Sequence, residues 1–322
     1  MKLVYIISQG HSGSTLTDCI LGTHPDFVSS GELCYLNWQL YRTLNTSGSI
    51  QEQNVCTCGK DFRACSFWSK VFIRIKEQTG KDIVNHPESF DTAFFGMFSF
   101  QERGGFERKF MDKVKSYSIR EWLERGNSLS SISWLEPKIT GWLKNNWLLY
   151  TAMAETANKK VVVDSSKDLR IALLLKEYKP KDVYVLFIHR DVKGLAASSK
   201  KLSENHGKTF SLDKIVREKV KFEKTVARVK KIKGINYMDF NYEDIVSQPA
   251  SFLEEVVKLV EVNPIYTKQA GAFFIDPSIQ HLVAGNPMRY KGKKEVVFDN
   301  SWEKKLNSQE LEQINTLMSH IK

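Results

Sequence analysis

The sequence predicts an α/β protein, a single domain of residues 1–322 in which helices flank a parallel β-sheet that carries a helical insertion. Short apolar runs typical of buried strands alternate with helical patterns, and this alternation favours parallel pairing of the strands. The chain also opens on a strand, a turn of small residues and a helix. With 322 residues, of which 42% are hydrophobic and 11% aromatic, it can bury a sizeable core.

The first strand is predicted at Leu3–Ile7, an apolar run rich in β-branched residues. The turn that follows, Ser8–Thr15, is rich in Gly, Ser and Thr, and a short helix is predicted from Leu16 to Gly22. A tight turn between a strand and a helix directs several backbone N–H groups and the positive end of the helix toward one point. The opening of the chain therefore predicts a site for a phosphate or sulfate group.

A second short strand is predicted at Phe27–Ser30, after the turn at Pro25 and before Gly31 and Glu32. Residues 33–158 then lack clear strand patterns, are rich in Trp and Phe, and contain helical patterns at 67–78 and 141–157. We interpret them as a helical insertion that packs on one face of the sheet. Most of its aromatic side chains are expected to serve the core.

The alternation of strands and helices returns after the insertion. Ser166 is expected to cap the first of the later helices, and the helix at 212–233 is charged and amphipathic. The predicted strands are Lys160–Asp164, Val183–Ile188 and Ile235–Phe240, and the helices that follow them are Leu169–Tyr178, Val192–Leu202 and Ser251–Val260.

Polar residues follow four of these strands, at the edge where ligands bind in parallel sheets. Gly10–Thr15 come after the first strand, Glu32 after the second, Lys167 after the third and Arg190 after the fourth. One carboxylate and two cations would thus lie near the anion-binding turn. Ser198, eight residues after Arg190, can share a ligand with it only if the chain bends suitably.

These segments resemble the sulfotransferases that use 3′-phosphoadenosine 5′-phosphosulfate (PAPS). The matching segments, in their order along the chain, are Gly10–Leu16 with Leu21–Pro25, Ile188–Asp191 continuing to Ala196–Ser198, Phe240–Ile245 with Gln248-Pro249, and Gly285–Arg289. Any one match is weak, but the ordered set covers most of the chain apart from the insertion at 33–158.

The resemblance implies a sulfotransferase fold related to that of P-loop NTPases. It also implies transfer of a sulfuryl group from PAPS to a hydroxyl or to an amine or guanidinium nitrogen of a small-molecule acceptor, with PAP as the product and no metal required. It assigns cofactor-binding roles as follows: Gly10, His11, Ser12, Gly13, Ser14 and Thr15 bind the 5′-phosphosulfate, Arg190 and Ser198 bind the 3′-phosphate, and Asn286 and Arg289 belong to a segment that closes over the nucleotide.

Three residues are the predicted catalytic groups. Lys167 resembles a lysine that contacts the transferring group, and His11 stands where family members usually carry Arg or Lys. Glu32 is the predicted general base, because one branch of the family has a catalytic Glu at this distance after its His-Pro. Alternatively, Glu32 orders the insertion or binds the acceptor as a counter-ion, and His206 or His281 is the base.

All five cysteines lie within the first 65 residues, and three of them, Cys56, Cys58 and Cys65, are close in sequence. Zinc requires four ligands, usually in pairs separated by two to four residues. Here one residue separates the first pair, and the fourth ligand would be Cys34 or a distant His. We therefore expect a tight turn with packed or disulfide-linked cysteines, and no metal.

The formal charge of +10 favours an anionic partner but does not identify it. A P-loop kinase is one alternative, although Ser14 stands where a kinase loop needs lysine and only Asp164 is placed to bind magnesium. A nucleic-acid-binding module is another, but the chain shows no nucleic-acid motif and the basic helix at 212–233 is typical of a solvated surface. We expect a small-molecule acceptor and no nucleic acid.

No apolar run approaches the length of about 18 residues that a membrane span needs. Met1 is followed at once by the first strand, which leaves no room for a signal peptide. We therefore expect a cytoplasmic protein that does not bind a membrane. The sequence leaves its oligomeric state open.

Overall fold

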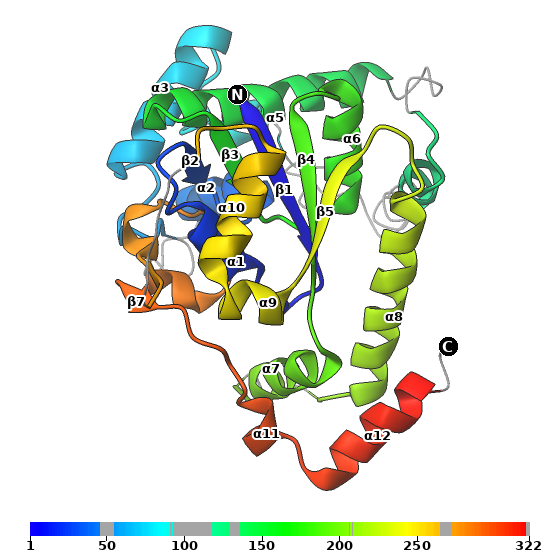
Figure 1. The fold of residues 1–322 in the computed structure, drawn as a ribbon. Helices are drawn as coiled ribbons and strands as arrows, with labels where there is room; N and C mark the ends of the chain where they lie inside the picture. The colour runs from blue at the N-terminus through cyan, green and yellow to red at the C-terminus, as the bar shows by residue number, and fades with distance from the viewer. Residues whose placement is uncertain are drawn as a thin grey trace.

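The computed structural model describes residues 1–45, 55–90, 92, 117–128, 136–205, 207, 209–264 and 272–319. Its centre is a five-stranded parallel sheet with the strand order β2-β3-β1-β4-β5 (Figure 1). The α/β class with a parallel sheet flanked by helices, predicted from sequence, is confirmed. The strands are β1 (Lys2–Ser8), β2 (Phe27–Ser29), β3 (Val161–Asp164), β4 (Val183–His189) and β5 (Asn236–Asn241).

The middle strand, β1, is apolar from Leu3 to Ile7, as expected for a strand that is covered on both faces of the sheet. Its residues Val4 and Ile6 contribute to the core on one face, whereas Leu3, Tyr5 and Ile7 contribute to the core on the other. A parallel sheet covered on both faces is the usual origin of such a continuous hydrophobic run. The apolar run at the start of the sequence is therefore the central strand of the sheet.

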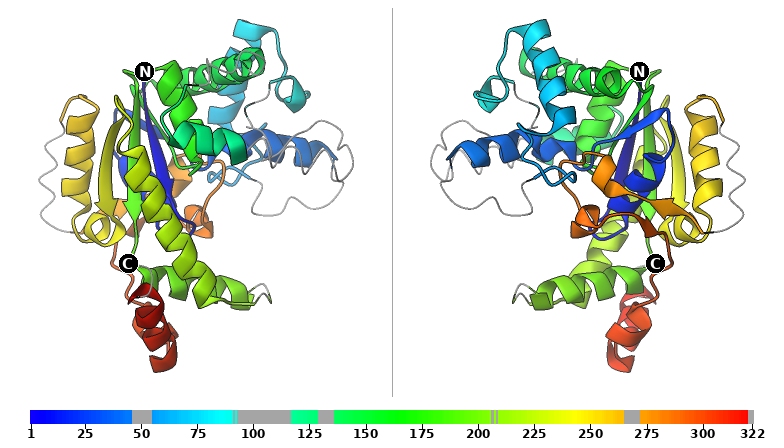
Figure 2. Two further views of the ribbon diagram at one scale, coloured as in Figure 1. Left: turned by 90° about the vertical axis from the view of Figure 1, so that its right-hand side faces the viewer. Right: turned by 90° about the vertical axis from the view of Figure 1, so that its left-hand side faces the viewer.

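Three helices cover one face of the sheet (Figure 2). They are α1 (Ser14–Leu21), α9 (Tyr242–Ser247) and α10 (Pro249–Leu259). The helix predicted at 251–260 begins two residues earlier than expected because Pro249 occupies its first turn, where proline has no N–H to leave unpaired.

The opposite face is covered by helices of the segment 33–158 together with α6 (Leu169–Tyr178), whose bounds are those predicted. The described helices of this segment are α2 (Leu36–Asn45), α3 (Ser66–Thr79), the helical residues 117–124 and α5 (Glu136–Ala157), and the short 3₁₀ turns are η1 (Leu33–Tyr35) and η3 (Pro87–Ser89). Trp68, Phe72 and Tyr150 are buried there, so these aromatic side chains are part of the core.

The later part of the chain adds a small third core below the sheet. It is formed by α7 (Val192–Asn205), α8 (Leu212–Val229), α11 (Trp302–Lys305) and α12 (Ser308–Ser319). A two-stranded antiparallel sheet, β6 (Phe274–Ile275) with β7 (Lys294–Glu295), lies near α1, and between these strands come the 3₁₀ turns η5 (Pro277–Ile279) and η6 (Pro287–Tyr290). The sequence analysis did not predict this second sheet.

The expected role of Ser166 as a helix cap is wrong. The side chain of Asp168 caps α6 and accepts a hydrogen bond of 2.9 Å from the backbone N–H of Arg170. Ser166 instead donates its hydroxyl to Asp164 and accepts a hydrogen bond from the N–H of Cys34. It therefore stabilises the end of β3 rather than the start of the helix.

Among the described residues, no helix is both long enough and apolar enough to cross a membrane.

Candidate active site

The loop between β1 and α1 has the backbone shape of an anion-binding turn. His11 and Gly13 both have left-handed backbones, with φ of 67° and 82°, and left-handed residues of this kind are typical of loops whose N–H groups form an anion-binding concavity. Ser14 and Thr15 are buried at the start of α1. The hydroxyl of Ser12 is also buried and has no hydrogen-bond partner within the described part of the chain.

Tyr242, at the start of α9, packs directly against this loop. A Cβ atom on Gly13 would lie 2.2 Å from two ring carbons of Tyr242, so only glycine fits at this position. The sequence analysis assigned no function to Tyr242, although it lies in the segment Phe240–Ile245 that resembles the family. An aromatic residue immediately after the last strand, at the carboxyl edge of the sheet, was the available signal.

Arg190 connects the end of β4 to the same loop. Its side chain is 8% exposed, lies over the ring of Tyr242 at 4.4 Å and donates a hydrogen bond of 2.5 Å to the backbone oxygen of His11. The Nε atom is buried and has no partner among the described residues, and one terminal nitrogen lies 3.8 Å from the carboxylate of Asp299. The structure thus brings the predicted cation and the predicted loop together.

Ser198, the other predicted ligand of the 3′-phosphate, lies half-buried in α7. Within the described residues it makes no hydrogen bond to Arg190. The two side chains are therefore not joined directly in this structure.

Glu32 and Lys167 form an ion pair at the ends of β2 and β3. Each side chain is 18% exposed, so the pair is largely shielded from solvent. Lys167 has a left-handed backbone with φ of 66°, an unfavourable conformation for a residue with a Cβ atom. Strained positions of this kind are concentrated at functional sites, where the surrounding structure holds them in place.

His11 lies close enough to two cations for them to affect its charge. Burial lowers the pKa of its imidazole, and the positive charges of Arg190 and Lys167 lower it further. The imidazole is therefore neutral at neutral pH, and it can donate a hydrogen bond without carrying the positive charge that Arg or Lys would bring.

The segment Gly285–Arg289 lies against the loop through its backbone. The N–H of Asn286 donates a hydrogen bond of 3.0 Å to the hydroxyl of Thr15, while the side chain of Asn286 caps η6. Arg289 is buried, and its guanidinium donates to the backbone oxygen of Val283 and to the hydroxyl of Tyr290. Asn286 is thus next to the loop, whereas Arg289 stabilises the segment itself.

Two buried carboxyl groups, those of Asp18 and Asp164, support the candidate site, although neither was assigned to it from the sequence. Asp18 in α1 accepts hydrogen bonds from the N–H of Gly31 and the hydroxyl of Ser165, which tie the helix to the ends of β2 and β3. Burial raises its pKa to about 7, although the hydrogen bond from Ser165 acts in the opposite direction. The only sequence signal was that Asp18 is the one charged residue of its helix.

Asp164 is the residue that a P-loop kinase would need for magnesium. One of its oxygens accepts hydrogen bonds from the N–H and hydroxyl of Ser166, and the other accepts a hydrogen bond of 2.7 Å from the hydroxyl of Tyr150. Because both oxygens are used within the protein, Asp164 is poorly placed to bind a metal ion. This arrangement disfavours the kinase alternative.

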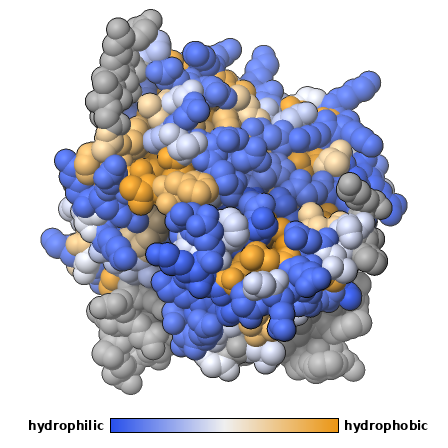
Figure 3. Space-filling view, turned by 60° about the horizontal axis from the view of Figure 1, so that its bottom comes forward, coloured by the Kyte–Doolittle hydropathy of each residue, from blue (hydrophilic) through white to orange (hydrophobic). Residues whose placement is uncertain are grey.

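A cavity of about 850 Å³ opens beside the loop, and His11 and Lys167 are part of its wall. Tyr117 and Arg120 are the described residues of the segment 33–158 that line this cavity. Figure 3 shows that the lower side of the molecule, toward which the strands run, is largely hydrophilic with separate hydrophobic areas. The remaining cavity lining includes the apolar Leu195, Leu202, Phe210, Phe222 and Val226 and the cationic Lys214 and Lys221.

His206 and His281 are the two histidines considered as alternative general bases. His206 lies outside the described residues. His281 lies with Cys56, Cys58 and Cys65, and all five cysteines of the chain are free thiols. The disulfide expected as one possibility for these cysteines is therefore absent, and the grouping with His281 is considered separately below.

A sequence model of the sulfotransferase family matches residues 4–264, so the chain belongs to the sulfotransferase family. The predicted family resemblance is thereby confirmed, and the chain is an enzyme of the class that takes its sulfuryl group from PAPS. No curated protein matches the chain significantly.

Solved structures similar to this chain include two bacterial sulfotransferase domains. One is the sulfotransferase domain from the curacin biosynthetic pathway, with 12% identity, 99% of this chain and 97% of that chain covered, and a TM-score of 0.47. The other is the sulfotransferase domain from the Synechococcus PCC 7002 olefin synthase, with 13% identity, 98% and 94% covered, and a TM-score of 0.44.

Proposed function

We propose that this sulfotransferase moves the sulfuryl group of PAPS to a hydroxyl, or to an amine or guanidinium nitrogen, of a small-molecule acceptor, by in-line transfer with a general base. The observation that carries the proposal is the hydrogen bond from Arg190 to the backbone oxygen of His11. It fixes a buried cation against an anion-binding loop, beside which Lys167 and Glu32 form their ion pair.

The residues around the loop fit a ligand with two anionic ends. The buried hydroxyl of Ser12 and the buried Nε of Arg190 have no partners in the described residues, and a Cβ atom on Gly10 would meet nothing within 4 Å. In our proposal Ser12–Thr15 bind the 5′-phosphosulfate with N–H groups and hydroxyls, and Arg190 binds the 3′-phosphate. PAPS, when bound, supplies the sulfuryl group and a phosphate leaving group.

The catalytic roles follow from the charges at the edge of the sheet. Lys167 and the neutral imidazole of His11 donate hydrogen bonds to the oxygen atoms on which negative charge develops, and fixed donors of this kind stabilise a transition state. Glu32 accepts the proton of the acceptor, and its ion pair with Lys167 orients the carboxylate before the acceptor binds.

The cavity beside His11 and Lys167 is the proposed acceptor site. Its wall is apolar for much of its extent and carries Lys214 and Lys221. Its volume is in the range of sites for small organic molecules. We therefore propose an acceptor with an apolar body that places its nucleophilic oxygen or nitrogen between Glu32 and the loop.

Isothermal titration of adenosine 3′,5′-bisphosphate into the purified protein tests the nucleotide site. We expect binding that is unchanged by magnesium or by EDTA. Arg190→Ala should weaken binding by about 2–4 kcal/mol, the cost of losing a desolvated charge-assisted contact, whereas Arg190→Lys should lose less. Binding of ATP with magnesium but not of adenosine 3′,5′-bisphosphate would contradict the proposal.

Glu32→Gln tests the base, because an amide of the same shape cannot accept the proton. We expect it to bind adenosine 3′,5′-bisphosphate normally and to lose turnover. The acceptor for that assay is found by mass spectrometry of a metabolite mixture incubated with PAPS and the enzyme, searching for products heavier by one SO₃. Unchanged turnover in Glu32→Gln would assign proton removal to another group.

A further inference from the structure

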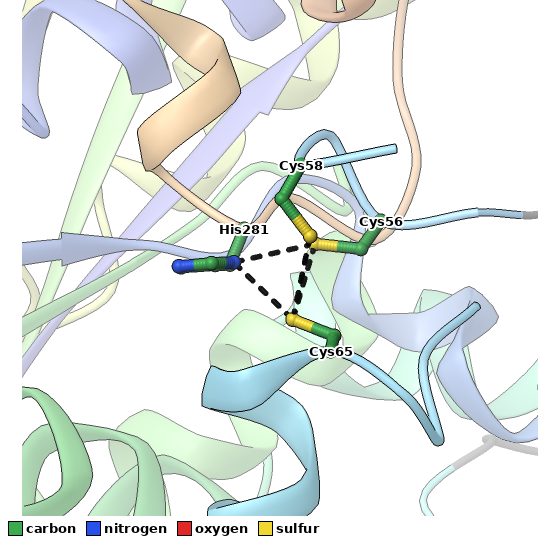
Figure 4. A group of neighbouring side chains, drawn as sticks. All are labelled: Cys56, Cys58, Cys65 and His281. Carbon is green, nitrogen blue, oxygen red and sulfur yellow. Dashed lines mark hydrogen bonds between the residues drawn. The ribbon is translucent and has the colours of Figure 1, made fainter. Parts of the chain in front are cut away.

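Four side chains with metal-binding atoms meet where the segment 33–158 contacts the last part of the chain (Figure 4). Cys56 and Cys58 come from one turn, Cys65 from the start of α3, and His281 from the segment between η5 and η6. Their three Sγ atoms and the histidine ring nitrogen all lie within 4.8 Å of one another. Figure 4 shows Nδ1 of His281 turned toward the sulfur atoms.

The distances between these atoms suit a tetrahedral zinc ion. Zn–S bonds of about 2.3 Å and Zn–N bonds of about 2.05 Å give tetrahedron edges of about 3.8 Å between sulfurs and about 3.6 Å between sulfur and nitrogen. The sulfur of Cys65 lies 3.6 Å from those of Cys56 and Cys58. Nδ1 of His281 lies 3.5 Å from Sγ of Cys56 and 3.3 Å from Sγ of Cys65.

Cys65 is too far from both other cysteines for an S–S bond of about 2.05 Å, and Cys56 and Cys58 are also free thiols in this structure. A disulfide would also leave the third thiol and the imidazole without a role. Three thiolates and one imidazole form a ligand set that structural zinc sites use, whereas calcium and magnesium select oxygen ligands.

The turn that carries Cys56 and Cys58 is held by its own backbone. The N–H of Gly59 donates to the oxygen of Cys56, the N–H of Cys56 donates to the oxygen of Lys60, and Gly59 has a left-handed φ of 82°. This geometry bends the chain so that both sulfur atoms point to the same side, despite the single residue between them.

His281 is held from two sides. Its ring stacks on Phe67 with centroids 5.1 Å apart, and its backbone oxygen accepts a hydrogen bond of 2.8 Å from the indole N–H of Trp68. Its own backbone has a left-handed φ of 58°, a conformation that these contacts maintain. The hydroxyl of Thr57 accepts a hydrogen bond from the N–H of Leu282, so the next residue also contacts the turn.

We propose that Cys56, Cys58, Cys65 and His281 bind one zinc ion that joins the segment 33–158 to the last part of the chain. The ion has all four ligands from the protein and is therefore structural. Its position gives it a specific effect, because the residues after His281 contact the candidate active site: the N–H of Glu32 donates to the oxygen of Ala284, and the N–H of Asn286 donates to Thr15. The zinc ion thus anchors the segment from His281 to Asn286, which lies against the loop between β1 and α1.

The inference is tested on the full-length protein, purified after expression with zinc in the medium. We expect one zinc ion per chain by elemental analysis. X-ray absorption at the zinc edge should give about three Zn–S distances near 2.3 Å and one Zn–N distance near 2.0–2.1 Å. A protein that contains no zinc and takes up none from added zinc chloride overturns the proposal, as does a spectrum with only oxygen and nitrogen ligands.

Variants locate the ion. Cys58→Ser combined with Cys65→Ser should lose the zinc, whereas Cys34→Ser, the same change in a buried cysteine outside the group, should retain one ion per chain. Retention of zinc by the double variant would also overturn the proposal. Should the double variant fail to fold, the absorption spectrum of the unmodified protein still decides, since it reports the ligand atoms directly.

Discussion

Gly13 sets how closely the loop after β1 approaches Tyr242. A methyl group at this position would overlap the ring, and the φ of 82° would be strained for any residue with a Cβ atom. Gly10, three residues earlier, has open space in the same direction and no such φ. Of these two glycines, therefore, only Gly13 is required by backbone conformation and by the space available.

The first prediction compares these glycines. Gly13→Ala should lower the free energy of unfolding by about 1–3 kcal/mol, from backbone strain and the displaced ring. Gly10→Ala should change it by less than about 0.5 kcal/mol. Urea unfolding of both variants without nucleotide checks the prediction, and equal destabilisation would show that the contact with Tyr242 is not what requires glycine at position 13.

Asp18 gives a second prediction at the residue scale, because its pKa is raised to about 7, chiefly by burial. A carboxyl group whose pKa is higher in the folded state than in the unfolded chain stabilises the fold at low pH, and this contribution is lost as the pH rises. The free energy of unfolding should therefore fall between about pH 4 and about pH 7.

Asp18→Asn should remove this dependence. The amide oxygen can accept the hydrogen bonds of Gly31 and Ser165, and the amide N–H₂ replaces the protonated oxygen. Asp18→Ala also removes the titrating group but leaves both donors unpaired, so it should be less stable than Asp18→Asn by about 1–3 kcal/mol at every pH. Urea unfolding at several pH values measures both effects; parallel curves for the unmodified protein and Asp18→Asn would contradict the assignment.

At the scale of elements, all five parallel strands could be predicted from the sequence, and β1, β3 and β4 are the clearest because each is a short apolar run stopped by turn residues. The bounds of α6 were also predictable, since its apolar positions and the proline after it are local features. The capping by Asp168 was not, because Ser166 and Asp168 are both good cap residues and the choice depends on Asp164 and Cys34, which bind Ser166. The β6–β7 pair, with two residues in each strand, depends on pairing over a long sequence distance.

His189 joins three elements, β4, β5 and α8, through its two ring nitrogens. Nδ1 lies 2.9 Å from the carboxylate of Glu223 in α8, and Nε2 lies 3.0 Å from that of Asp239 in β5. Burial acts to lower the pKa of His189, but the hydrogen bonds with the two carboxylates outweigh burial and raise it. Protonated His189 therefore helps to hold α8, which lines the candidate acceptor cavity, against the sheet.

We predict that the free energy of unfolding falls as His189 loses its proton. A raised histidine pKa contributes stability that is complete below the unfolded value of about 6.5 and is lost as the pH rises through the folded value. In His189→Gln this part of the pH dependence should disappear, because glutamine keeps a donor but does not titrate. Urea unfolding between about pH 6 and about pH 9 measures it; an identical slope in the variant would show that another group is responsible.

At the scale of the whole molecule, the site residues that could be predicted from the sequence are those that the topology of the sheet alone brings together. The carboxyl ends of parallel strands meet at one edge, so Glu32, Lys167 and Arg190 could be placed near the loop from strand order alone. The fourth member of the cysteine group could not be named, because His281 is more than 200 residues from Cys56 and no spacing rule relates them. The same holds for Asp299, whose proximity to Arg190 depends on the path of the last part of the chain.

Asp299 connects that last part of the chain with the candidate nucleotide site. Its carboxylate lies 3.8 Å from a terminal nitrogen of Arg190 and is half-exposed, in the segment that leads into α11 and the small third core. If Arg190 binds the 3′-phosphate, this carboxylate both competes for the guanidinium and repels the nucleotide. The negative charge of Asp299 then lies next to Arg190, the proposed phosphate-binding cation, and weakens binding of the nucleotide.

Asp299→Asn should therefore strengthen the binding of adenosine 3′,5′-bisphosphate by about two- to fivefold at low salt, since an ion pair with one exposed partner is worth up to about 1 kcal/mol. The gain should shrink at high ionic strength, where exposed charges are screened. Glu303→Gln removes the same charge from an exposed position on α11 and serves as the control. Titration calorimetry at two salt concentrations measures the difference. Weaker binding in Asp299→Asn would mean that Asp299 positions Arg190 for the nucleotide instead of competing with it, and equal gains in both variants would reduce the effect to net charge.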